Sequence, residues 1–364
     1  MSDEERLIGI GIIGAGFARS TQIPAFQACE GARVVAIASR HKENAAKVAG
    51  EFGIEHVAED WREIVGRADV DLISIVTPPV THAEMTLAAL DAGKAVLCEK
   101  PMAMNAVEAD AMRERATQAG ALALVDHELR FVPGRRLMRE MLRRGDIGRL
   151  RHAKLLFRAD SRSGPERLWD WWSDREAGGG ALGAIGSHAV DAFRWLLGAE
   201  VKAVFCQLAT HTGERALKAT NELRPVTTDD EANLLLRFTD NDVAQGATGA
   251  ISLSVAEPGR PEHRLEIFGS EGALMIEDDG RLWQARRGEG LWQEVETEQG
   301  ELAPGMRDSS WSRGFTTFSR AIVAALREGR ASIEEAATFT DGYQTQLVLD
   351  AARRSHESGK MESI

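Results

Sequence analysis

Residues 7–20 read LIGIGIIGAGFARS, and this stretch decides the fold of the N-terminal part of the chain. Its first seven residues are apolar apart from two glycines, a run too short for a typical helix and typical of a strand buried on both faces. The next residues place Gly14 and Gly16 in the frame of the dinucleotide fingerprint, whose glycines permit a tight turn and let the backbone approach a pyrophosphate. The third fingerprint position is Arg19, so the fingerprint is incomplete and its context decides its meaning.

The residues after this turn alternate between helical and strand-like segments. A helix is expected over 20–28 and a buried strand over 33–39, which completes one βαβ unit. The pattern continues with helices expected at 43–52, 61–65, 81–92 and 105–119 and buried strands at 70–76, 94–98 and 122–125. Successive right-handed crossovers build a doubly wound parallel sheet, so we expect an NAD(P)-binding α/β Rossmann domain over residues 1–125.

After residue 125 the pattern changes. A helix is expected over 135–143, and strand-like segments then follow without intervening helices, at 151–158, 201–208, 232–238, 247–255, 264–268 and 273–276. Helices return at 315–328 and 333–356. We therefore expect residues 126–364 to form an α+β domain with a large, mainly antiparallel open sheet.

The composition argues against several classes of function. A formal net charge of -12 argues against a nucleic-acid partner, because binding to phosphates needs a basic surface. No apolar stretch reaches transmembrane length, and the acidic N-terminus lacks the pattern of a signal peptide. Cys29, Cys98 and Cys206 lie far apart, and the histidines show no ligand spacing. We expect a cytoplasmic protein without a metal site, a nucleic-acid partner or membrane attachment.

The fingerprint turn and the end of the second strand are expected to bind the cofactor. The turn contributes Gly14, Gly16, Phe17 and Ala18. The second strand ends in Ser39-Arg40, where an acidic residue would bind the adenosine ribose of NAD. No Asp or Glu occupies that position, and Ser39 and Arg40 can instead bind and neutralise a ribose phosphate. We therefore predict that NADP is preferred over NAD; the alternative is that these are ordinary loop residues.

Later strands of the same domain deliver further candidates. Thr77 and Pro78 form a rigid loop after one strand, and His82 begins the next helix, where it either flanks the nicotinamide or makes only local hydrogen bonds. Glu99 and Lys100 follow another strand and precede a proline. Because ligands of open α/β sheets gather at the carboxyl ends of the strands, we expect Lys100 beside the bound dinucleotide.

Four motifs together carry a family resemblance. They are Gly14-Ala15-Gly16-Phe17, Thr77-Pro78-Pro79 with His82, Gly93-Lys94 through Glu99-Lys100-Pro101, and Gly178-Gly179-Gly180-Ala181-Leu182 through His188 to Asp191. Over nearly its whole length the chain resembles the glucose-fructose oxidoreductase, inositol dehydrogenase and rhizopine-catabolism (Gfo/Idh/MocA) family. The resemblance implies a C-terminal sheet that joins a homodimer or homotetramer. It also implies hydride transfer between NAD(P) and a carbinol or carbonyl group of a sugar, cyclitol or related polyol.

The same resemblance implies catalytic residues. Lys100 matches the lysine near nicotinamide and substrate, and His188 matches the histidine that gives or takes the proton, a role suited to a side chain that titrates near neutral pH. Many members carry an aspartate four residues before that histidine, where this chain has Ala184. Asp191, one turn after His188, is either a supporting residue or a structural one that orients His188 or pairs with Arg194.

Three further side chains are candidates for the substrate site. Glu128 and Arg130 follow the last expected Rossmann strand, and Trp172 precedes the glycine run. A structural salt bridge is the alternative for the charged pair, and core packing is the alternative for the tryptophan. Two other functions stay open: a glycosidase that transiently oxidises its substrate with a tightly held NAD, and a non-catalytic dinucleotide-binding regulator, which Ala184 suggests.

Overall fold

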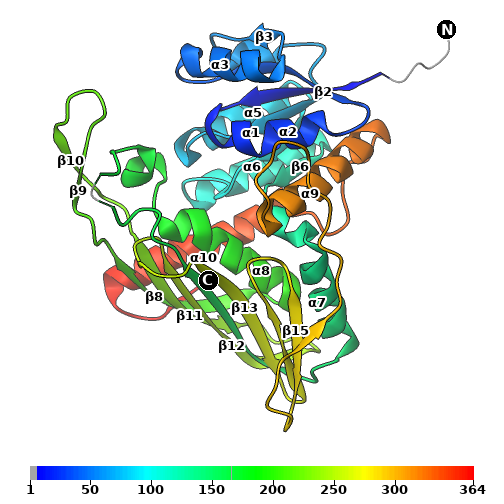
Figure 1. Ribbon diagram of the computed structural model, residues 1–364, viewed down its shortest axis with the longest axis vertical. Helices are drawn as coiled ribbons and strands as arrows, with labels where there is room; N and C mark the ends of the chain where they lie inside the picture. Colours follow the sequence, from blue (N-terminus) through cyan, green and yellow to red (C-terminus); the bar gives the residue numbers. More distant parts are fainter. Residues whose placement is uncertain (1–5, 165) are drawn as a thin grey trace. The chain divides into compact units, whose positions relative to one another are not determined.

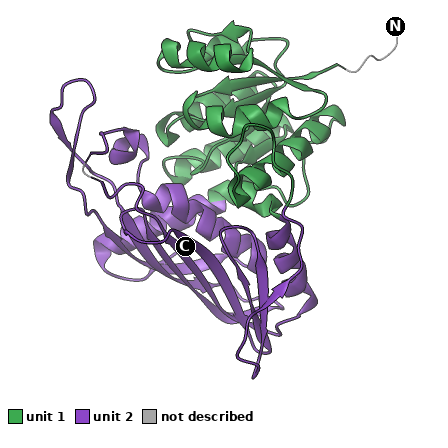
Figure 2. Ribbon diagram, viewed as in Figure 1, with its two compact units in different colours: residues 1–132, 300–343 green, residues 133–299, 344–364 purple. Residues whose placement is uncertain are grey.

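The computed structural model describes residues 6–164 and 166–364. The chain folds into two compact units, which Figure 2 colours separately. Unit 1 comprises Met1–Val132 and Gly300–Tyr343, and unit 2 comprises Pro133–Gln299 and Gln344–Ile364. The units therefore differ from the domains expected from the sequence, since residues 300–343 belong to unit 1 and its first segment continues to residue 132.

Unit 1 contains a six-stranded sheet with the strand order β3-β2-β1-β4-β5-β6 (Figure 1). All of its strand pairs are parallel. The strands are β1 Ile8–Ile13, β2 Ala32–Ala38, β3 His56–Val57, β4 Leu72–Ile75, β5 Ala95–Cys98 and β6 Ala123–Val125. This order is that of a doubly wound Rossmann sheet, whose direction reverses between β1 and β4, so the expected fold of this part is confirmed.

Helices cover both faces of this sheet. They are α1 Gly16–Ser20, α2 Gln22–Gln27, α3 Lys42–Phe52, α4 Trp61–Val65, α5 His82–Asp91 and α6 Ala106–Ala119. The helix expected over 20–28 corresponds to α2, and the short helix α1 before it was not expected. Ile10 and Ile12 pack with residues of α2 and α3 on one face, while Ile73 and Ile75 pack with residues of α5 and α6 on the other. Burial on both faces explains why these strands are continuous apolar runs.

The later segment of unit 1 joins it through aromatic packing. Helix α9, Ser310–Arg327, places Phe315 edge-to-face against Phe26 at 5.7 Å and Phe318 in a stack on Phe131 at 4.5 Å. All four rings are buried. The sequence of an amphipathic helix shows that the helix has an apolar face, but not which surface covers that face. We therefore expected residues 300–343 in the second domain only because they follow it in the sequence.

Unit 2 contains a nine-stranded sheet with the order β16-β15-β14-β13-β7-β12-β11-β8-β17. Only β7 and β12 pair in parallel, so the expected mainly antiparallel sheet is confirmed. The strands are β7 Leu150–Arg158, β8 Val201–Ala209, β11 Glu231–Phe238, β12 Ala244–Ser254, β13 Glu262–Gly269, β14 Gly272–Ile276, β15 Leu282–Arg286, β16 Gln293–Val295 and β17 Glu362–Ser363. A separate ribbon pairs β9, Glu214–Ala216, with β10, Leu223–Pro225.

Three helices pack on one face of this sheet (Figure 1). They are α7 Pro133–Arg144, α8 Ser187–Leu197 and α10 Phe339–Ser358, and their apolar residues share one core with the inward side chains of the strands. Helix α8 lies between β7 and β8, where we expected no helix, so that expectation was wrong, and α10 begins at Phe339 rather than at 333. Within the described residues no helix is long and apolar enough to span a bilayer.

Candidate active site

The carboxyl edge of the Rossmann sheet collects most of the cofactor residues expected from the sequence. Gly14 follows β1, Ser39 follows β2, Thr77 lies just beyond β4, and Glu99 directly follows β5. Because parallel strands end at the same edge, these residues from distant parts of the sequence meet there. Asp126, which directly follows β6, joins the set and was not singled out from the sequence.

The fingerprint turn leaves its backbone open to a ligand. Gly14 has φ +111°, and a Cβ built there would lie 2.2 Å from the carbonyl oxygen of Val76, so only glycine fits. A Cβ on Gly16 would meet no atom within 4 Å. The open backbone at the start of α1 therefore suits a pyrophosphate. Phe17 is 46% exposed, whereas Ala18 is fully buried.

The end of β2 presents a polar surface without a carboxylate at its tip. Ser39 is half-buried and Arg40 is exposed. The neighbouring Lys42 is ion-paired with Glu59, so its charge is already partly compensated. Arg19, at the third fingerprint position, pairs with Glu51 of α3 at 2.6 Å. Of these basic residues, Lys42 and Arg19 thus already have carboxylate partners.

His82 lies between two loops at the carboxyl edge of the sheet. Its ring is fully buried, with Nε2 2.8 Å from the carbonyl oxygen of Thr77 and Nδ1 3.1 Å from that of Pro101. Burial lowers the pKa of His82, so the neutral ring donates to one of the two carbonyls at a time. The local hydrogen bonds considered from the sequence are present, and they tie the Thr77-Pro78 loop to the turn that carries Lys100.

Glu99 is anchored by a buried polar network. The Gln22 amide donates through Nε2 to Glu99 Oε1 at 2.9 Å and to Asp126 Oδ2 at 3.0 Å. The Ser74 hydroxyl donates to Gln22 Oε1, which fixes the orientation of the amide. Lys100 itself is only half-buried, and its peptide bond to Pro101 is cis. The buried carboxylate thus anchors a turn whose lysine keeps access to solvent.

Two carboxyl groups lie close to this network after β6. Asp126 is 1 % exposed, and burial together with the charges of Glu99 and Glu128 raises its pKa well above the usual value. Glu128 is itself buried, at 4 % exposure. Gln22, Ser74 and Asp126 were missed because their relation to Glu99 exists only in three dimensions. The single signal in the sequence was that Asp126 directly follows an apolar run, as Glu99 does.

The expected substrate residue Arg130 is engaged in a salt bridge. Its Nη2 lies 3.1 Å from Asp341 Oδ1, and its side chain is 5 % exposed. Its Nη1 also donates to the carbonyl oxygen of Glu335 at 3.5 Å. The alternative considered from the sequence, a structural ion pair, is therefore present for Arg130.

In unit 2, His188 lies in the first turn of α8, directly after a π-helical turn over Leu182–Gly186. The turn is anchored by Asp229, whose Oδ2 accepts the Leu182 N–H at 2.6 Å and whose carbonyl accepts the Ala181 N–H at 3.0 Å. Burial raises the pKa of Asp229. His188 is 5 % exposed, so its position is set by a packed helix rather than by a loop.

The glycine run before this helix has a packing reason. Gly180 has φ +107°, and a Cβ there would lie 2.5 Å from Asp229 Oδ1, while a Cβ on Gly179 would lie 2.3 Å from the carbonyl oxygen of Trp172. The Trp172 ring faces the Arg162 guanidinium at 4.6 Å and meets Trp171 edge-on. The structure thus gives Trp172 a packing role within unit 2.

Ala184 and Asp191 lie on either side of His188, one in the π-helical turn and the other in α8. Ala184 is buried in the π-helical turn, and Asp191 is buried three residues after His188. Arg194 forms a two-point ion pair with Glu200, at 2.5 and 2.8 Å. The Glu200 carboxylate is therefore one partner of the Arg194 side chain.

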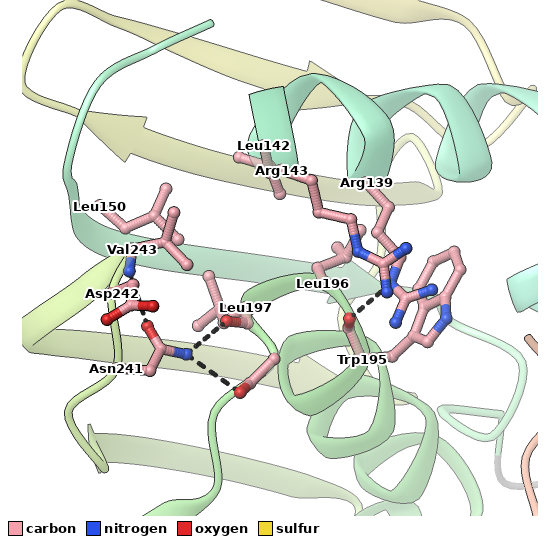
Figure 3. Close-up of a pocket in the computed structure, with 11 residues that line it drawn as sticks. Arg139, Leu142, Arg143, Leu150, Trp195, Leu196, Leu197, Asn241, Asp242 and Val243 are labelled. Atoms are coloured by element: carbon pink, nitrogen blue, oxygen red, sulfur yellow. Dashed lines mark hydrogen bonds between the residues drawn. The ribbon is translucent and has the colours of Figure 1, made fainter. Parts of the chain in front are cut away.

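A separate hollow of about 240 Å³ lies in unit 2 at the end of α8 (Figure 3). Arg139 Nε donates to the Trp195 carbonyl at 2.9 Å, and Asn241 Nδ2 donates to the carbonyls of Leu197 and Gly198 at 3.0 Å each. These bonds satisfy carbonyls that the last turn of a helix leaves without intrahelical donors. The hollow is lined by none of the residues expected to bind cofactor or substrate.

Comparisons with known families agree with this architecture. Residues 8–127 match the model of the oxidoreductase family with an NAD-binding Rossmann fold, and residues 136–275 match the GFO/IDH/MocA C-terminal domain. The chain belongs to the Gfo/Idh/MocA oxidoreductase family. It is therefore an oxidoreductase with an NAD-binding Rossmann domain, as the resemblance of its motifs implied.

Several Gfo/Idh/MocA relatives resemble the chain over most of its length. Levoglucosan dehydrogenase of Pseudarthrobacter phenanthrenivorans is 30% identical over 389 residues, covering 94% of this chain and 95% of the relative. The 1,5-anhydro-D-fructose reductase of Ensifer adhaerens is 34% identical over 268 residues, covering 73% and 74%. The structure of levoglucosan dehydrogenase in complex with NADH and L-sorbose has a TM-score of 0.87 at 27% identity, with 99% of each chain covered.

Proposed function

We propose that this protein is an NAD(P)-dependent dehydrogenase or reductase that interconverts a carbinol and a carbonyl group on a sugar, cyclitol or related polyol. The observation that carries the proposal is the position of Lys100. It stands on a turn anchored through buried Glu99, at the same sheet edge as the open backbone of Gly16. The names of the relatives, which act on levoglucosan and on 1,5-anhydro-D-fructose, support a sugar-like substrate.

The proposed chemistry divides between two side chains. Oxidation of a carbinol removes a hydride from carbon and a proton from oxygen, and leaves a carbonyl group. A bound nicotinamide supplies the acceptor for the hydride. We assign the proton to His188, whose imidazole is suited to proton transfer near neutral pH, and we assign the stabilisation of the developing alkoxide to the Lys100 ammonium. In the reverse direction His188 donates the proton.

For the cofactor we propose a preference for NADP over NAD. Support comes from Ser39 and exposed Arg40 at the end of β2, where the chain has no carboxylate to bind a ribose hydroxyl pair. The remaining cofactor contacts are proposed for Gly14, Gly16, Phe17, the backbone of Ala18, Thr77, Pro78 and Glu99. His82 acts through the two loops that it joins. Replacing Arg40 with Ala should raise the Michaelis constant for NADP more than that for NAD.

We propose that the protein is a homodimer or homotetramer joined through the open face of the nine-stranded sheet. This face carries Phe205, Leu235 and Leu156 among polar residues, around a hollow of about 480 Å³. Leu235 is 54% exposed, which is unusual for a leucine in the middle of a strand.

We propose a cytoplasmic location for the protein. Its three cysteines are buried free thiols, which suits a reducing compartment.

A spectrophotometric screen tests the proposed function. Reduction of NAD and NADP is measured with a panel of polyols and anhydrosugars, and oxidation of NADH and NADPH with the corresponding ketoses. The proposal predicts turnover with at least one member of the panel and a lower Michaelis constant for NADP. Tight NADH binding without turnover in either direction would contradict the dehydrogenase and favour a regulator. A lower Michaelis constant for NAD would contradict the cofactor preference alone.

A further inference from the structure

The buried network beneath the Glu99-Lys100 turn has an unusual balance of donors and acceptors. The two hydrogens of the Gln22 amide are both used, one on Glu99 and one on Asp126, at 2.9 and 3.0 Å. The amide cannot be turned around, because its oxygen accepts the Ser74 hydroxyl and would otherwise face two carboxyl groups. Each carboxyl group thus receives one hydrogen from Gln22.

The second oxygen of Asp126 has no such donor. Oδ1 is buried, and no hydrogen-bond donor of the described residues reaches it. Among the charged groups that act on Asp126, the carboxylates of Glu99 and Glu128 have larger effects than the ammonium of Lys100. An ionised carboxylate in this position would leave one oxygen buried and unsatisfied beside two like charges. A proton on Asp126 removes the charge repulsion, and the resulting O–H group can donate to Glu99, whose carboxyl group interacts with that of Asp126 by a side-chain hydrogen bond.

We propose that Asp126 is a positioning residue that stands as a neutral carboxylic acid, donates a hydrogen bond through its O–H group to the Glu99 carboxyl group and, with Gln22, fixes Glu99 and the turn that carries Lys100. Asp126 acts through Glu99 and is not itself a catalytic residue. The inference rests on the proposed role of Lys100 only for its functional consequence, since the protonation of Asp126 can be measured on the protein alone.

Infrared spectroscopy tests the protonation directly. A protonated carboxyl group has a carbonyl stretch separate from that of a carboxylate. The wild-type protein should show this band at pH 8, where ordinary Asp and Glu are ionised. Asp126→Asn should lower the intensity of the band, whereas the control Asp91→Asn, at an exposed position of α5, should leave it unchanged. Absence of the band from the wild-type protein, or an unchanged intensity in Asp126→Asn, would overturn the proposal.

The positioning role is tested with NADH as the probe, by the quenching of tryptophan fluorescence between pH 6 and 9. An asparagine amide can donate to Glu99 as the neutral acid does, so Asp126→Asn should bind NADH within about twofold of wild type across this range. Asp126→Leu and Gln22→Leu, which remove the donors, should weaken NADH binding about tenfold.

Two results separate positioning from mere stability. Asp126→Asn should melt within about 3 °C of the wild-type protein, so its behaviour reports on a folded molecule. NADH binding by Asp126→Leu at wild-type affinity would contradict the positioning role. A strong pH dependence of NADH binding that disappears in Asp126→Asn would show instead that Asp126 ionises in the native protein. Neither measurement needs a substrate, so both remain decisive if the proposed polyol chemistry fails.

Discussion

At the scale of single residues, the structure combines an accessible lysine with buried anchors. Glu99, His82 and Gln22 are buried and hydrogen-bonded, whereas Lys100 is half-buried. A group that must meet a ligand cannot be fully enclosed by its own chain, yet its position must be reproducible. The rigidity therefore lies in the neighbours of Lys100, and the His82 ring joins the two loops on which they stand.

A buried histidine of unit 2 makes stability depend on pH. His263 accepts a hydrogen bond at Nε2 from Arg135 at 3.3 Å, and burial together with the Arg135 charge lowers the pKa of His263 to about 3. The unfolded chain, with an ordinary histidine pKa of about 6.5, therefore binds a proton first as the pH falls. The free energy of unfolding should decrease by about 2 kcal/mol between pH 7 and pH 5 on account of this residue.

Urea denaturation at pH 7 and pH 5 measures this difference. His263→Gln keeps an acceptor for Arg135 but cannot titrate, so it should lose less stability than the wild type over the same interval. The exposed His41 offers a control, since His41→Gln should leave the pH dependence unchanged. Equal losses in wild type and His263→Gln would contradict the assignment.

At the scale of secondary-structure elements, the helix that carries His188 depends on one carboxyl group. Asp229 accepts the Leu182 N–H at 2.6 Å, and its side chain occupies the space left by Gly180. Asp229→Ala should lower the free energy of unfolding by about 1–3 kcal/mol, because it leaves a buried backbone N–H without an acceptor. Asp229→Asn keeps an acceptor oxygen and should cost less. Chemical denaturation of both variants compares them, and an equal cost would contradict the capping role.

The elements also show what could be predicted from the sequence. Strands β1, β2, β4, β5 and β6 are buried on both faces, so each appears as a local apolar run followed by a loop that carries candidate residues. Helix α8 was not expected, and its segment is buried all round, so even its polar residues Ser187, Asp191 and Arg194 lie inside the molecule. The network of Gln22, Ser74 and Asp126 could not be predicted from the sequence. Its members lie far apart along the chain and come together only when the strands and α2 have packed.

At the scale of the whole molecule, the open sheet face decides the proposed assembly. Leu235→Glu replaces an exposed leucine of that face with a charged side chain and should convert the oligomer to a monomer, because the apolar contact is lost and a carboxylate would have to be desolvated on assembly. Leu223→Glu, on the exposed β10, is the matched control and should leave the mass unchanged. Light scattering after size-exclusion chromatography gives both masses. A monomeric wild type, or an unchanged mass for Leu235→Glu, would contradict this interface.

The central claim is that Lys100 serves hydride transfer on a polyol or sugar carbinol. The most direct test is the turnover number of Lys100→Met with the best substrate of the panel, measured beside its dissociation constant for NADH. Methionine keeps the length and apolar body of the side chain and removes only its charge and donors. The account predicts that kcat falls by about 10²–10⁴-fold while NADH binding stays within about threefold of wild type. A Lys100→Met variant that turns over at the wild-type rate would contradict it.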